Sequence, residues 1–435
     1  MVKMNESGIQ WLGLYPETWN LKKIKYCLRE RVEKNNPIKT TDILSLTAKQ
    51  GVIPYDQKEG GGNKPKEDFS AYRLAYPGDI VMNSMNILSG SVGLSQFFGC
   101  VSPVYYMLRP FEKSEDVRFY NYIFQTTVFQ SSLFGLGNGI LIKESGNGKL
   151  NTIRMRIPMD KFGNLFIPVA PSDEQKKIAD FLDLKCAEID KISTDVQEEI
   201  EILENFKRSL IIETVYRGLT SNVETKESGI EWVGRIPKHW DIHPIYTYFV
   251  ERKNKNKFGK EDNLLSLSYG NVVRKDINTS DGLLPESFNT YNIVEKGDII
   301  IRPTDLQNDK RSLRTGLVRE HGIITSAYIA LMPIGKIDTR YFRYLLHSYD
   351  VMKVFYNMGN GVRQGLNFSE FSRLMVFEPP YEEQVEMADY LDKKVADIDA
   401  IIDTKKEQLE VIEDYKKSFI YEYVTGKKEV PADVG

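Results

Sequence analysis

Apolar residues recur at alternating intervals of three and four along the stretch that follows Pro171. This is the spacing of a coiled-coil seam, and it predicts one long helix over residues 171–216, capped by Ser172 or Asp173. Around forty helical residues at about 1.5 Å each give a rod of roughly 60 Å, which is too long for an ordinary globular helix. The seam consists of Ile178, Leu182, Ile189, Ile192, Val196, Leu203, Phe206 and Leu210, and it is interrupted by Lys185 and Glu199.

A second stretch with the same spacing begins after Pro379 and predicts a helix over residues 380–426. Its seam consists of Met387, Leu391, Ile398, Ile401, Ile412, Tyr415 and Phe419. Amphipathic helices must bury their apolar stripes, and each of these helices is the most economical partner for the other. We therefore expect the two helices to pack as an antiparallel coiled coil, related by a pseudo-twofold axis.

The sequence before each predicted helix is a repeat. Residues 6–19 return as residues 227–240 with eight of fourteen positions identical, at an offset of 227 − 6 = 221. A repeat this long describes two similar domains in tandem rather than the short units of a solenoid. The duplicated element contains all four tryptophans (Trp11, Trp19, Trp232 and Trp240), and we interpret it as two copies of a structural corner.

Strands and tight turns dominate the rest of each repeat. Residues 75–82 and 294–301 each place a Gly-Asp turn before a short β-branched run, which is typical of a strand leaving a turn. Residues 101–108 and 323–331 predict a further matched strand that ends near Pro110 or Pro333. The sequence therefore predicts two similar α+β domains with an internal pseudo-twofold repeat. The predicted division is 1–170 (first domain), 171–216 (helix), 217–226 (linker), 227–379 (second domain), 380–426 (helix) and 427–435 (tail).

Length, charge and cysteine content narrow the class of protein. At 435 residues the chain fits two or three domains, and it contains neither a membrane-spanning apolar run nor an amino-terminal signal stretch, so we expect a cytoplasmic protein that does not bind a membrane. Three widely spaced cysteines indicate neither a disulfide framework nor a structural zinc. The net charge is −3, but residues 252–260 and 310–319 are basic runs, which are either solvated faces or phosphate contacts.

Motifs for catalysis are weak. The four histidines (His239, His243, His321 and His347) form no His-Glu-x-x-His motif and no two-histidine-plus-carboxylate pattern, and prolines flank the one pair that is four residues apart. Gly146-Asn147-Gly148-Lys149 lacks the hydroxyl residue of a P-loop. The segment Glu378-Pro379-Pro380-Tyr381 has Glu where amino-methyltransferases need Asp or Asn, so it is better explained as a strand-to-helix junction. We therefore predict no catalytic residue, no metal site and no cofactor in this chain.

Several motifs resemble those of the specificity subunit of type I restriction-modification systems, over nearly the whole chain. They are Pro-x-x-Glu-Gln at 171–175 and 380–384, Ala-Asp-Phe/Tyr-Leu-Asp at 179–183 and 388–392, Ile-Asp at 189–190 and 398–399, Glu-x-Val at 213–215 and 422–424, Thr-Gly-Lys at 425–427, the tryptophan element and the Gly-Asp-Ile turn.

The resemblance implies a division of labour between subunits. Each α+β domain would be a target recognition domain that reads one half of a split double-stranded DNA sequence. The helices would set the gap and dock two methyltransferase (modification) subunits. Adenine methylation with S-adenosylmethionine would belong to those partners, and cleavage driven by ATP, with Mg, to separate restriction (endonuclease/translocase) subunits. No enzymatic activity is implied for this chain alone.

Candidate DNA-contacting residues follow the matched strands and carry suitable donors or acceptors. Asn and Gln can bind adenine bidentately, Arg can bind guanine, and Lys can bind phosphate. In the first domain they are Lys49, Gln50, Asn83, Ser84, Asn86 and Ser89. In the second domain they are Tyr269, Asn271, Arg302, Thr304, Gln307, Asn308, Lys310, Arg311 and Arg314.

Two other classes of function remain open at this point. One alternative is a non-catalytic scaffold, in which a helical spacer carries two domains that bind protein or glycan. DNA affinity would then be absent. The other alternative is a stand-alone modification enzyme, which would need to bind a methyl donor. We also expect that exchanging the domain before Pro171 changes one half of the target, and that lengthening the linker near Thr220 changes the gap.

Overall fold

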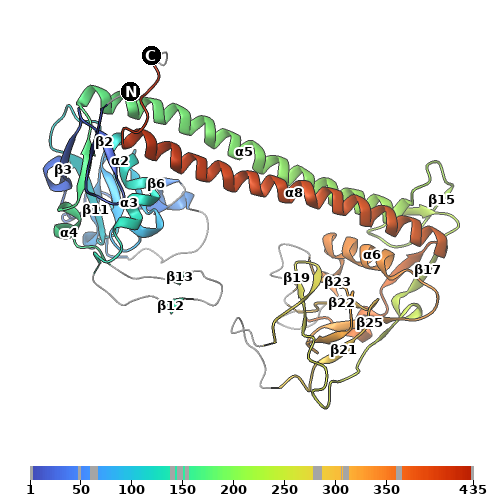
Figure 1. Ribbon diagram of the computed structural model, residues 1–435. Helices are drawn as coiled ribbons and strands as arrows, with labels where there is room; N and C mark the ends of the chain where they lie inside the picture. Colours follow the sequence, from blue (N-terminus) through green and yellow to red (C-terminus); the bar gives the residue numbers. More distant parts are fainter. Residues whose placement is uncertain are drawn as a thin grey trace. The chain divides into compact units, whose positions relative to one another are not determined.

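The structure is a computed structural model that describes residues 3–47, 50–58, 67–137, 143–144, 150–151, 156–277, 287–304, 306, 313–358 and 365–432. It divides into two compact units, one made of Met1–Val196 with Glu407–Gly435 and the other of Gln197–Lys406. Each unit holds strands, short helices and part of both long helices (Figure 1). The predicted α+β class is confirmed. The compact units divide the chain within the long helices, whereas the sequence-based division places its boundaries at the helix ends.

The first unit begins with a series of short strands. They are β1 (Met4–Glu6), β2 (Leu14–Pro16), β3 (Asn20–Lys23), β4 (Leu28–Glu30), β5 (Leu44–Thr47), β6 (Gly51–Pro54), β7 (Arg73–Ala75), β8 (Ile80–Asn83), β9 (Val92–Leu94), β10 (Gly99–Val101), β11 (Tyr105–Pro110), β12 (Lys143–Glu144), β13 (Leu150–Asn151) and β14 (Phe166–Val169). The helices are α1 (Ile24–Cys27), α2 (Val117–Gln125), α3 (Thr127–Ser132), α4 (Met159–Gly163) and the long α5 (Ser172–Arg217), which continues into the second unit.

The second unit repeats this order of elements. Its strands are β15 (Thr225–Glu227), β16 (Arg235–Pro237), β17 (Asp241–Pro244), β18 (Phe249–Glu251), β19 (Leu265–Ser268), β20 (Asn271–Arg274), β21 (Asn292–Val294), β22 (Ile299–Ile301), β23 (Thr315–Leu317), β24 (Gly322–Ile324), β25 (Ile329–Pro333) and β26 (Met375–Glu378). Its helices are α6 (Thr339–Val351), α7 (Phe368–Phe371) and the long α8 (Tyr381–Val424), which continues into the first unit.

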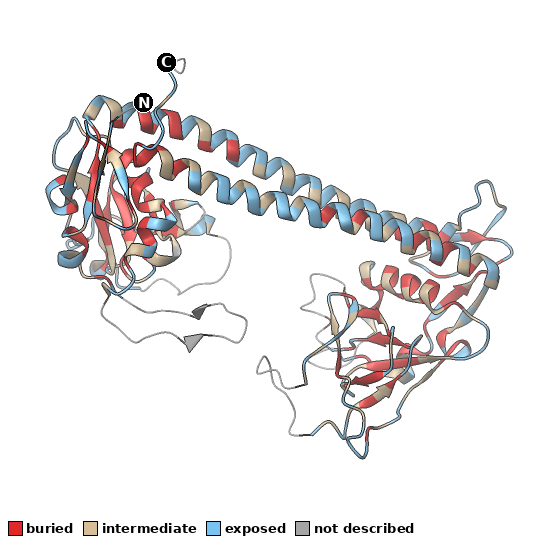
Figure 2. Ribbon diagram, viewed as in Figure 1, coloured by how far each residue is buried: buried red, intermediate tan, exposed pale blue. Residues whose placement is uncertain are grey.

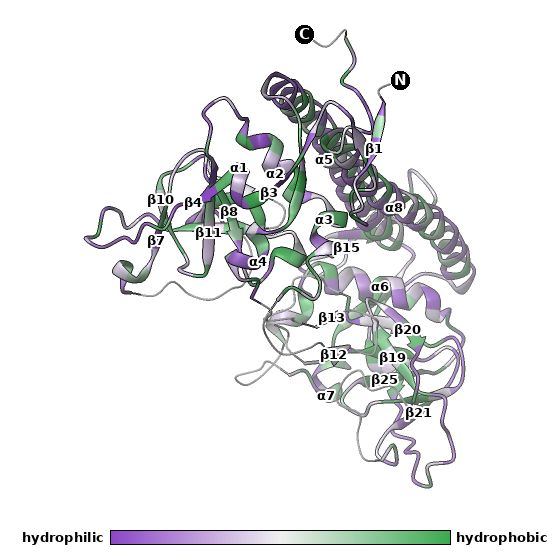
Figure 3. Cartoon of the chain, turned by 60° about the vertical axis from the view of Figure 1, so that its left-hand side comes forward, coloured by the Kyte–Doolittle hydropathy of each residue, from purple (hydrophilic) through white to green (hydrophobic). Residues whose placement is uncertain are grey.

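The two units share their strand pairings. The central antiparallel sheet has the order β4-β11-β8-β9 in the first unit and β18-β25-β22-β23 in the second. The pairs β14-β3, β10-β7 and β5-β6 correspond to β26-β17, β24-β21 and β19-β20. The central strands are largely buried, with Ile80 and Ile299 fully so, and the sheets appear mainly green in the hydropathy view (Figure 3).

Both Gly-Asp turns precede a strand as predicted. The prediction of one further strand at 101–108 and at 323–331 is wrong, because each range is divided between two strands. Residues 101–108 form the end of β10 and the start of β11, which are separated by a turn in which Tyr105 N donates to Ser102 O at 3.0 Å. Residues 323–331 are divided in the same way, with Tyr328 N donating to Thr325 O at 3.2 Å. The chain leaves one sheet at this turn and enters another, because β10 pairs with β7 whereas β11 pairs with β4 and β8.

The long helices run antiparallel where they meet inside each unit. In the first unit Lys416 Nζ of α8 lies 2.6 Å from Asp190 Oδ1 of α5. In the second unit Lys207 Nζ of α5 lies 2.5 Å from Asp399 Oδ1 of α8. The two pairs are the same Lys-Asp contact with the helices exchanged, since each lysine lies 209 residues from the other (416 − 207) and so does each aspartate (399 − 190).

The predicted apolar seam is only partly buried. Its members beside the α+β domains, such as Ile178 and Leu391, are buried, whereas Ile192, Phe206, Ile401 and Tyr415 are each about half exposed, at 52%, 56%, 47% and 56%. Figure 2 shows this exposed character along the middle of both helices. A helix covered on one side by a single partner helix cannot bury the whole width of an apolar stripe, and lysine-carboxylate pairs occupy part of the contact.

A buried glutamine joins each long helix to its α+β domain. Gln175 Oε1 accepts from Asp116 N at 3.0 Å and its Nε2 donates to Ala170 O at 2.9 Å. Gln384 does the same in the second unit, with Asp338 N and Pro379 O both at 2.9 Å. Both glutamine residues are almost completely buried. Each therefore connects three backbone segments: the start of the long helix, the strand before it, and the N-terminus of α2 or α6.

An arginine in the first turn of α2 or α6 reinforces each of these junctions. Arg118 of α2 lies 2.6 Å from Asp116 and 2.7 and 2.6 Å from Asp180 and Asp183 of α5. In the second unit Arg340 makes the equivalent contacts with Asp338, Asp389 and Asp392 at 2.6, 2.6 and 3.2 Å. The two aspartates of the Ala-Asp-Phe/Tyr-Leu-Asp motif thus bind the arginine of the domain that precedes the helix.

The tryptophan element covers the end of a long helix in each unit. Trp19 and Trp240 are buried, at 4% and 0% exposure. The helix ends at a glycine with positive φ, Gly426 beside Trp19 and Gly218 beside Trp240, and a Cβ on either would lie 3.2 or 3.3 Å from the indole ring. Both positions therefore suit glycine for its backbone conformation and for its lack of a side chain. The interpretation of the element as a structural corner is confirmed for these two tryptophans.

We predict that Gln384→Leu destabilises the second unit by about 2–4 kcal/mol, because the Asp338 N–H and Pro379 C=O lose their partner while remaining buried. Denaturant unfolding followed by circular dichroism measures this change. Glu382→Gln is the matched control, since Glu382 lies two residues away, is 76% exposed, and pairs only loosely with Lys336 at 3.5 Å. A loss no larger than that of the control would show that the buried bridge is not what holds the helix to the domain.

Candidate nucleic-acid interface

A tight hairpin carries the first group of predicted DNA-contacting residues in the second unit. Strands β19 and β20 are joined by Tyr269 and Gly270, whose φ angles of 47° and 80° fit the two-residue turn that suits antiparallel strands. Tyr269 is 69% exposed and Asn271 is exposed beside it. Helix α6 supports the turn, because Arg343 Nη2 donates to Gly270 O at 3.3 Å.

The second group follows β22. Arg302 and Thr304 are exposed, and their backbone carbonyls both accept from Arg314 Nη1, at 3.2 Å for Arg302. Arg314 itself is only 4% exposed, and its N–H donates to Asp350 Oδ2 of α6 at 2.9 Å. The prediction that Arg314 reads a base does not fit this position. Its guanidinium instead fixes the backbone that presents Arg302 and Thr304.

The first unit has the equivalent hairpin, β5–β6, and the equivalent connection between β8 and β9. Gln50 is exposed near the hairpin turn, and Asn86 is exposed in the connection, whereas Asn83 at the end of β8 is half-buried with its Oδ1 accepting from Met85 N at 3.0 Å. Ser84 is fully buried and its hydroxyl donates to Val104 O at 2.7 Å. The prediction of a DNA contact at Ser84 therefore does not fit its position, because this hydroxyl stabilises the turn.

Six predicted residues have no described side chain. Lys49, Gln307, Asn308, Lys310 and Arg311 lie outside the described residues, and Ser89 is described only as the last residue of a short 3-10 helix, Ile87–Ser89. Their contact with DNA stays a prediction.

A glycine lets the hairpin lie against the sheet in both units. A Cβ on Gly93 of β9 would lie 2.9 Å from the Cα of Gly51, which begins β6. A Cβ on Gly316 of β23 would meet the Leu267 side chain and would lie 3.0 Å from Val272 Cγ2. The structure therefore brings the predicted residues of the hairpin and those of the neighbouring connection to adjacent places in each unit.

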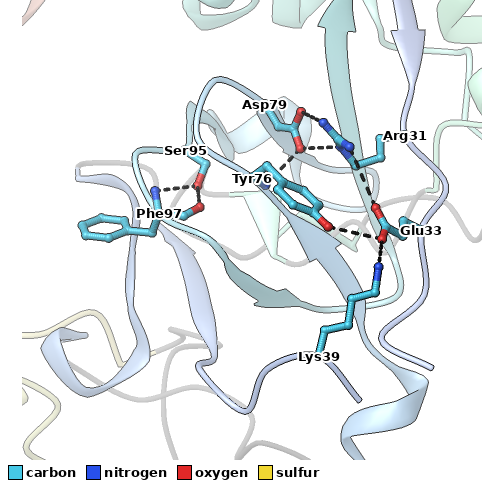
Figure 4. A network of polar contacts seen from close by, with 7 residues as sticks. All are labelled: Arg31, Glu33, Lys39, Tyr76, Asp79, Ser95 and Phe97. Atoms are coloured by element: carbon cyan, nitrogen blue, oxygen red, sulfur yellow. Dashed lines mark hydrogen bonds and ion pairs between the residues drawn. The ribbon is translucent and has the colours of Figure 1, made fainter. Parts of the chain in front are cut away.

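An arginine-aspartate pair that the sequence pattern did not reveal supports the Gly-Asp turn. Arg31 binds both carboxylate oxygens of Asp79, at 2.9 and 3.2 Å, and its guanidinium lies 4.3 Å from the Tyr76 ring centroid (Figure 4). Arg252 binds Asp298 in the same way at 3.0 Å, and burial raises the pKa of that carboxyl in spite of the arginine. The sequence does repeat both residues of the pair: Arg31 returns as Arg252 at an offset of 221, and Asp79 returns as Asp298 at an offset of 219.

Within the ranges given above, no group of three His, Cys, Asp or Glu side chains is placed to hold a metal ion. No helix among the same residues combines the length and the apolar character that crossing a membrane requires.

Comparison with known proteins shows what this chain is similar to. Residues 249–411 match the family model described as the type I restriction modification DNA specificity domain. The MjaVIII specificity subunit of a type I restriction enzyme from Methanocaldococcus jannaschii is 26% identical over 296 residues, which cover 62% of this chain and 63% of that protein. The putative MjaX specificity subunit of the same organism is 25% identical over 279 residues, covering 61% of this chain and 60% of the relative. Each alignment spans less than two thirds of the relative's length.

A solved structure from work on complex assembly and conformational transition of the type I R-M system shares the fold, with a TM-score of 0.67 and 12% identity, covering 95% of this chain and 99% of that one. At this identity the likeness concerns the fold alone. Residues 249–411 are thus similar to the type I restriction modification DNA specificity domain, and the chain is similar over part of its length to type I restriction enzyme specificity subunits.

We predict that Gly93→Ala lowers the stability of the first unit by about 1–3 kcal/mol, because the new methyl group meets the Gly51 backbone and the hairpin must move. Hydrogen exchange at Val52–Ile53 reports the hairpin directly and should become faster. Gly365→Ala is the control, since its Cβ would meet nothing within 4 Å. Unchanged exchange in the hairpin would contradict the close approach of β9 and β6.

Proposed function

We propose that this chain is the DNA sequence-specificity subunit of a type I restriction-modification complex, and that each α+β domain reads one half of a bipartite target. The observation that carries the proposal is the repeated scaffold, in which a hairpin and a connection lie side by side in both units but present different polar side chains. Gln50 and Asn86 stand on one scaffold, and Tyr269, Asn271 and Arg302 on the other. Different donors and acceptors on one framework suit two readers of different base sequences.

The long helices are proposed as the spacer between the two readers. With 46 and 44 residues, α5 and α8 are each about 66–69 Å long at about 1.5 Å per residue. Their matched Lys-Asp pairs support one antiparallel coiled coil with a pseudo-twofold axis. Under this proposal residues 1–170 and 227–379 are the recognition domains, and the buried glutamine at each helix start fixes the direction in which a domain leaves its helix.

The same helices are proposed to dock two methyltransferase subunits, which would carry S-adenosylmethionine, while separate restriction subunits would use ATP and Mg. The half-exposed apolar residues Ile192, Phe206, Ile401 and Tyr415 support this docking, because a partner helix or sheet would remove them from water. The chain itself would perform no catalysis. A scaffold that binds protein or glycan is the alternative, and absence of salt-sensitive DNA affinity in the assembled complex would favour it.

We predict that exchanging residues 1–170 for those of a related specificity subunit changes one half of the methylated motif and leaves the other half and the gap unchanged. The reason is that the second domain and both helices remain as they were. Sequencing of the adenine methylome in cells that also express the modification subunits measures the motif. A change in both halves would contradict the assignment of one reader to each domain.

We predict that Arg302→Ala weakens binding to the target by about 1–3 kcal/mol and relaxes the choice of base at one position in the second half-site only, since arginine reads guanine edges. Competition binding with duplexes substituted base by base in either half-site measures both effects. Arg235→Ala is the control, because Arg235 is equally a surface arginine of this unit but pairs with Glu227 at 2.8 Å. An equal loss for all sequences would assign Arg302 to phosphate instead.

A further inference from the structure

A loop with the same internal anchor follows β4 in the first unit and β18 in the second, at residues 35–40 and 256–261. In the first, Asn35 is 0% exposed, its amide donates to Thr40 O at 2.8 Å and its Oδ1 accepts from Lys39 N at 2.8 Å. In the second, Asn256 is 3% exposed, donates to Glu261 O at 2.8 Å and accepts from Glu261 N at 3.2 Å. A buried amide that both donates and accepts fixes the base of each of these anchored loops.

Each anchored loop presents an apolar side chain to solvent. Ile38 is 56% exposed, and Phe258 is 82% exposed, the highest value for a large hydrophobic side chain among the described residues. Gly259, with φ of +58°, follows Phe258 and forms the turn. Its N–H donates to Asn256 O at 2.9 Å, so the turn that carries the phenylalanine is itself tied to the anchor. An aromatic ring held outward on a fixed turn is placed for contact with a partner.

Phe258 lies within a run of cationic residues. The sequence from Arg252 to Lys260 contains no acidic residue. Lys260 Nζ lies 5.8 Å from the Phe258 ring centroid, and neither Lys257 nor Lys260 forms an ion pair within the described part of the chain. In the first unit the corresponding charge is neutralised, because Lys39 Nζ lies 2.6 Å from Glu33 Oε1 (Figure 4).

We propose that the anchored loop at residues 256–261 is a further DNA contact, in which Lys257 and Lys260 bind phosphates and Phe258 packs against sugars and base edges in the minor groove. Two lysines in the same loop as an exposed ring suit a polyanion that also offers flat apolar surface. Apolar side chains of minor-groove proteins insert between bases in this way. A basic protein partner would be repelled by the same lysines. The inference rests on the proposed function and adds a surface outside the hairpin and the connection.

The two lysines are tested together. The probe is the complex of the full chain with its modification subunits, titrated at several salt concentrations with a duplex carrying its methylated motif and with an unrelated duplex. Lys257→Gln with Lys260→Gln should reduce the slope of log affinity against log salt by about two and weaken both duplexes alike, by about tenfold near physiological salt. Lys238→Gln is the control, because Lys238 is an exposed cation of the same unit that already pairs with Glu224.

The aromatic contact is tested by Phe258→Ala, with Tyr246→Ala as the control, since Tyr246 is a 57% exposed aromatic residue of the same unit that lies outside the loop. Phe258→Ala should lower affinity about fivefold or more while leaving the salt slope unchanged, because no charge is removed. Equal melting temperatures for variants and parent show that the fold is intact, which the exposure of all these side chains favours.

The outcomes separate this inference from the proposed function. A parent complex that binds DNA, with loop variants of unchanged affinity and slope, overturns the loop contact and leaves the specificity assignment intact. Loss of the modification subunits from the loop variants, measured by size-exclusion chromatography, also overturns it, because the loop would then be a protein contact. A parent complex without salt-sensitive DNA binding overturns both.

Discussion

The structure depends on how a long helix is joined to the domain before it. At both junctions one buried glutamine, Gln175 or Gln384, accepts a hydrogen bond from the backbone N–H of an aspartate. The same glutamine donates to the backbone carbonyl of the residue five positions earlier in the chain. The same aspartate then caps α2 or α6 and binds an arginine that reaches two carboxylates on the long helix. Because the amide is buried, a different angle between helix and domain would leave polar groups without partners. These contacts hold the start of each long helix to the domain before it.

The repeat gives the proposed recognition surfaces a common frame. In each unit a glycine in the outer strand of the central sheet, Gly93 or Gly316, admits the neighbouring hairpin, and an Arg-Asp pair supports the Gly-Asp turn. Residues of this kind are required by the fold and are the same in both copies. Exposed residues on the frame differ between the copies, for example Gln50 in one hairpin and Tyr269 in the other. Two readers of different base sequences need this combination of an unchanged frame and different exposed side chains.

The long helices and the Gly-Asp turns could be predicted from the sequence, because periodicity and turn chemistry are local. The division of residues 101–108 between two sheets could not, because it depends on which distant strand each part pairs with. Gln175 and Gln384 were visible as a motif, but their partners Asp116 and Asp338 lie 59 and 46 residues away, and only the fold brings them together.

Residue type also reveals what a side chain can bind but not which way it faces. Ser84 and Arg314 have suitable chemistry for DNA, yet both are turned inward to hold the backbone of the segments that carry their exposed neighbours. The prediction that the apolar seam is buried was only partly correct, for a related reason. Heptad spacing identifies an apolar stripe, but the extent of its burial depends on how many elements cover it, and Phe206 and Tyr415 remain half exposed.

We propose that two related readers, held apart by helices, select one split DNA sequence for subunits that do the chemistry. The most direct measurement is the adenine methylome of cells that express the modification subunits, compared with and without this chain. The account predicts one motif that depends on the chain, made of two short specific parts separated by a gap of constant length. Methylation that is unchanged without the chain, or a single uninterrupted motif, would contradict it.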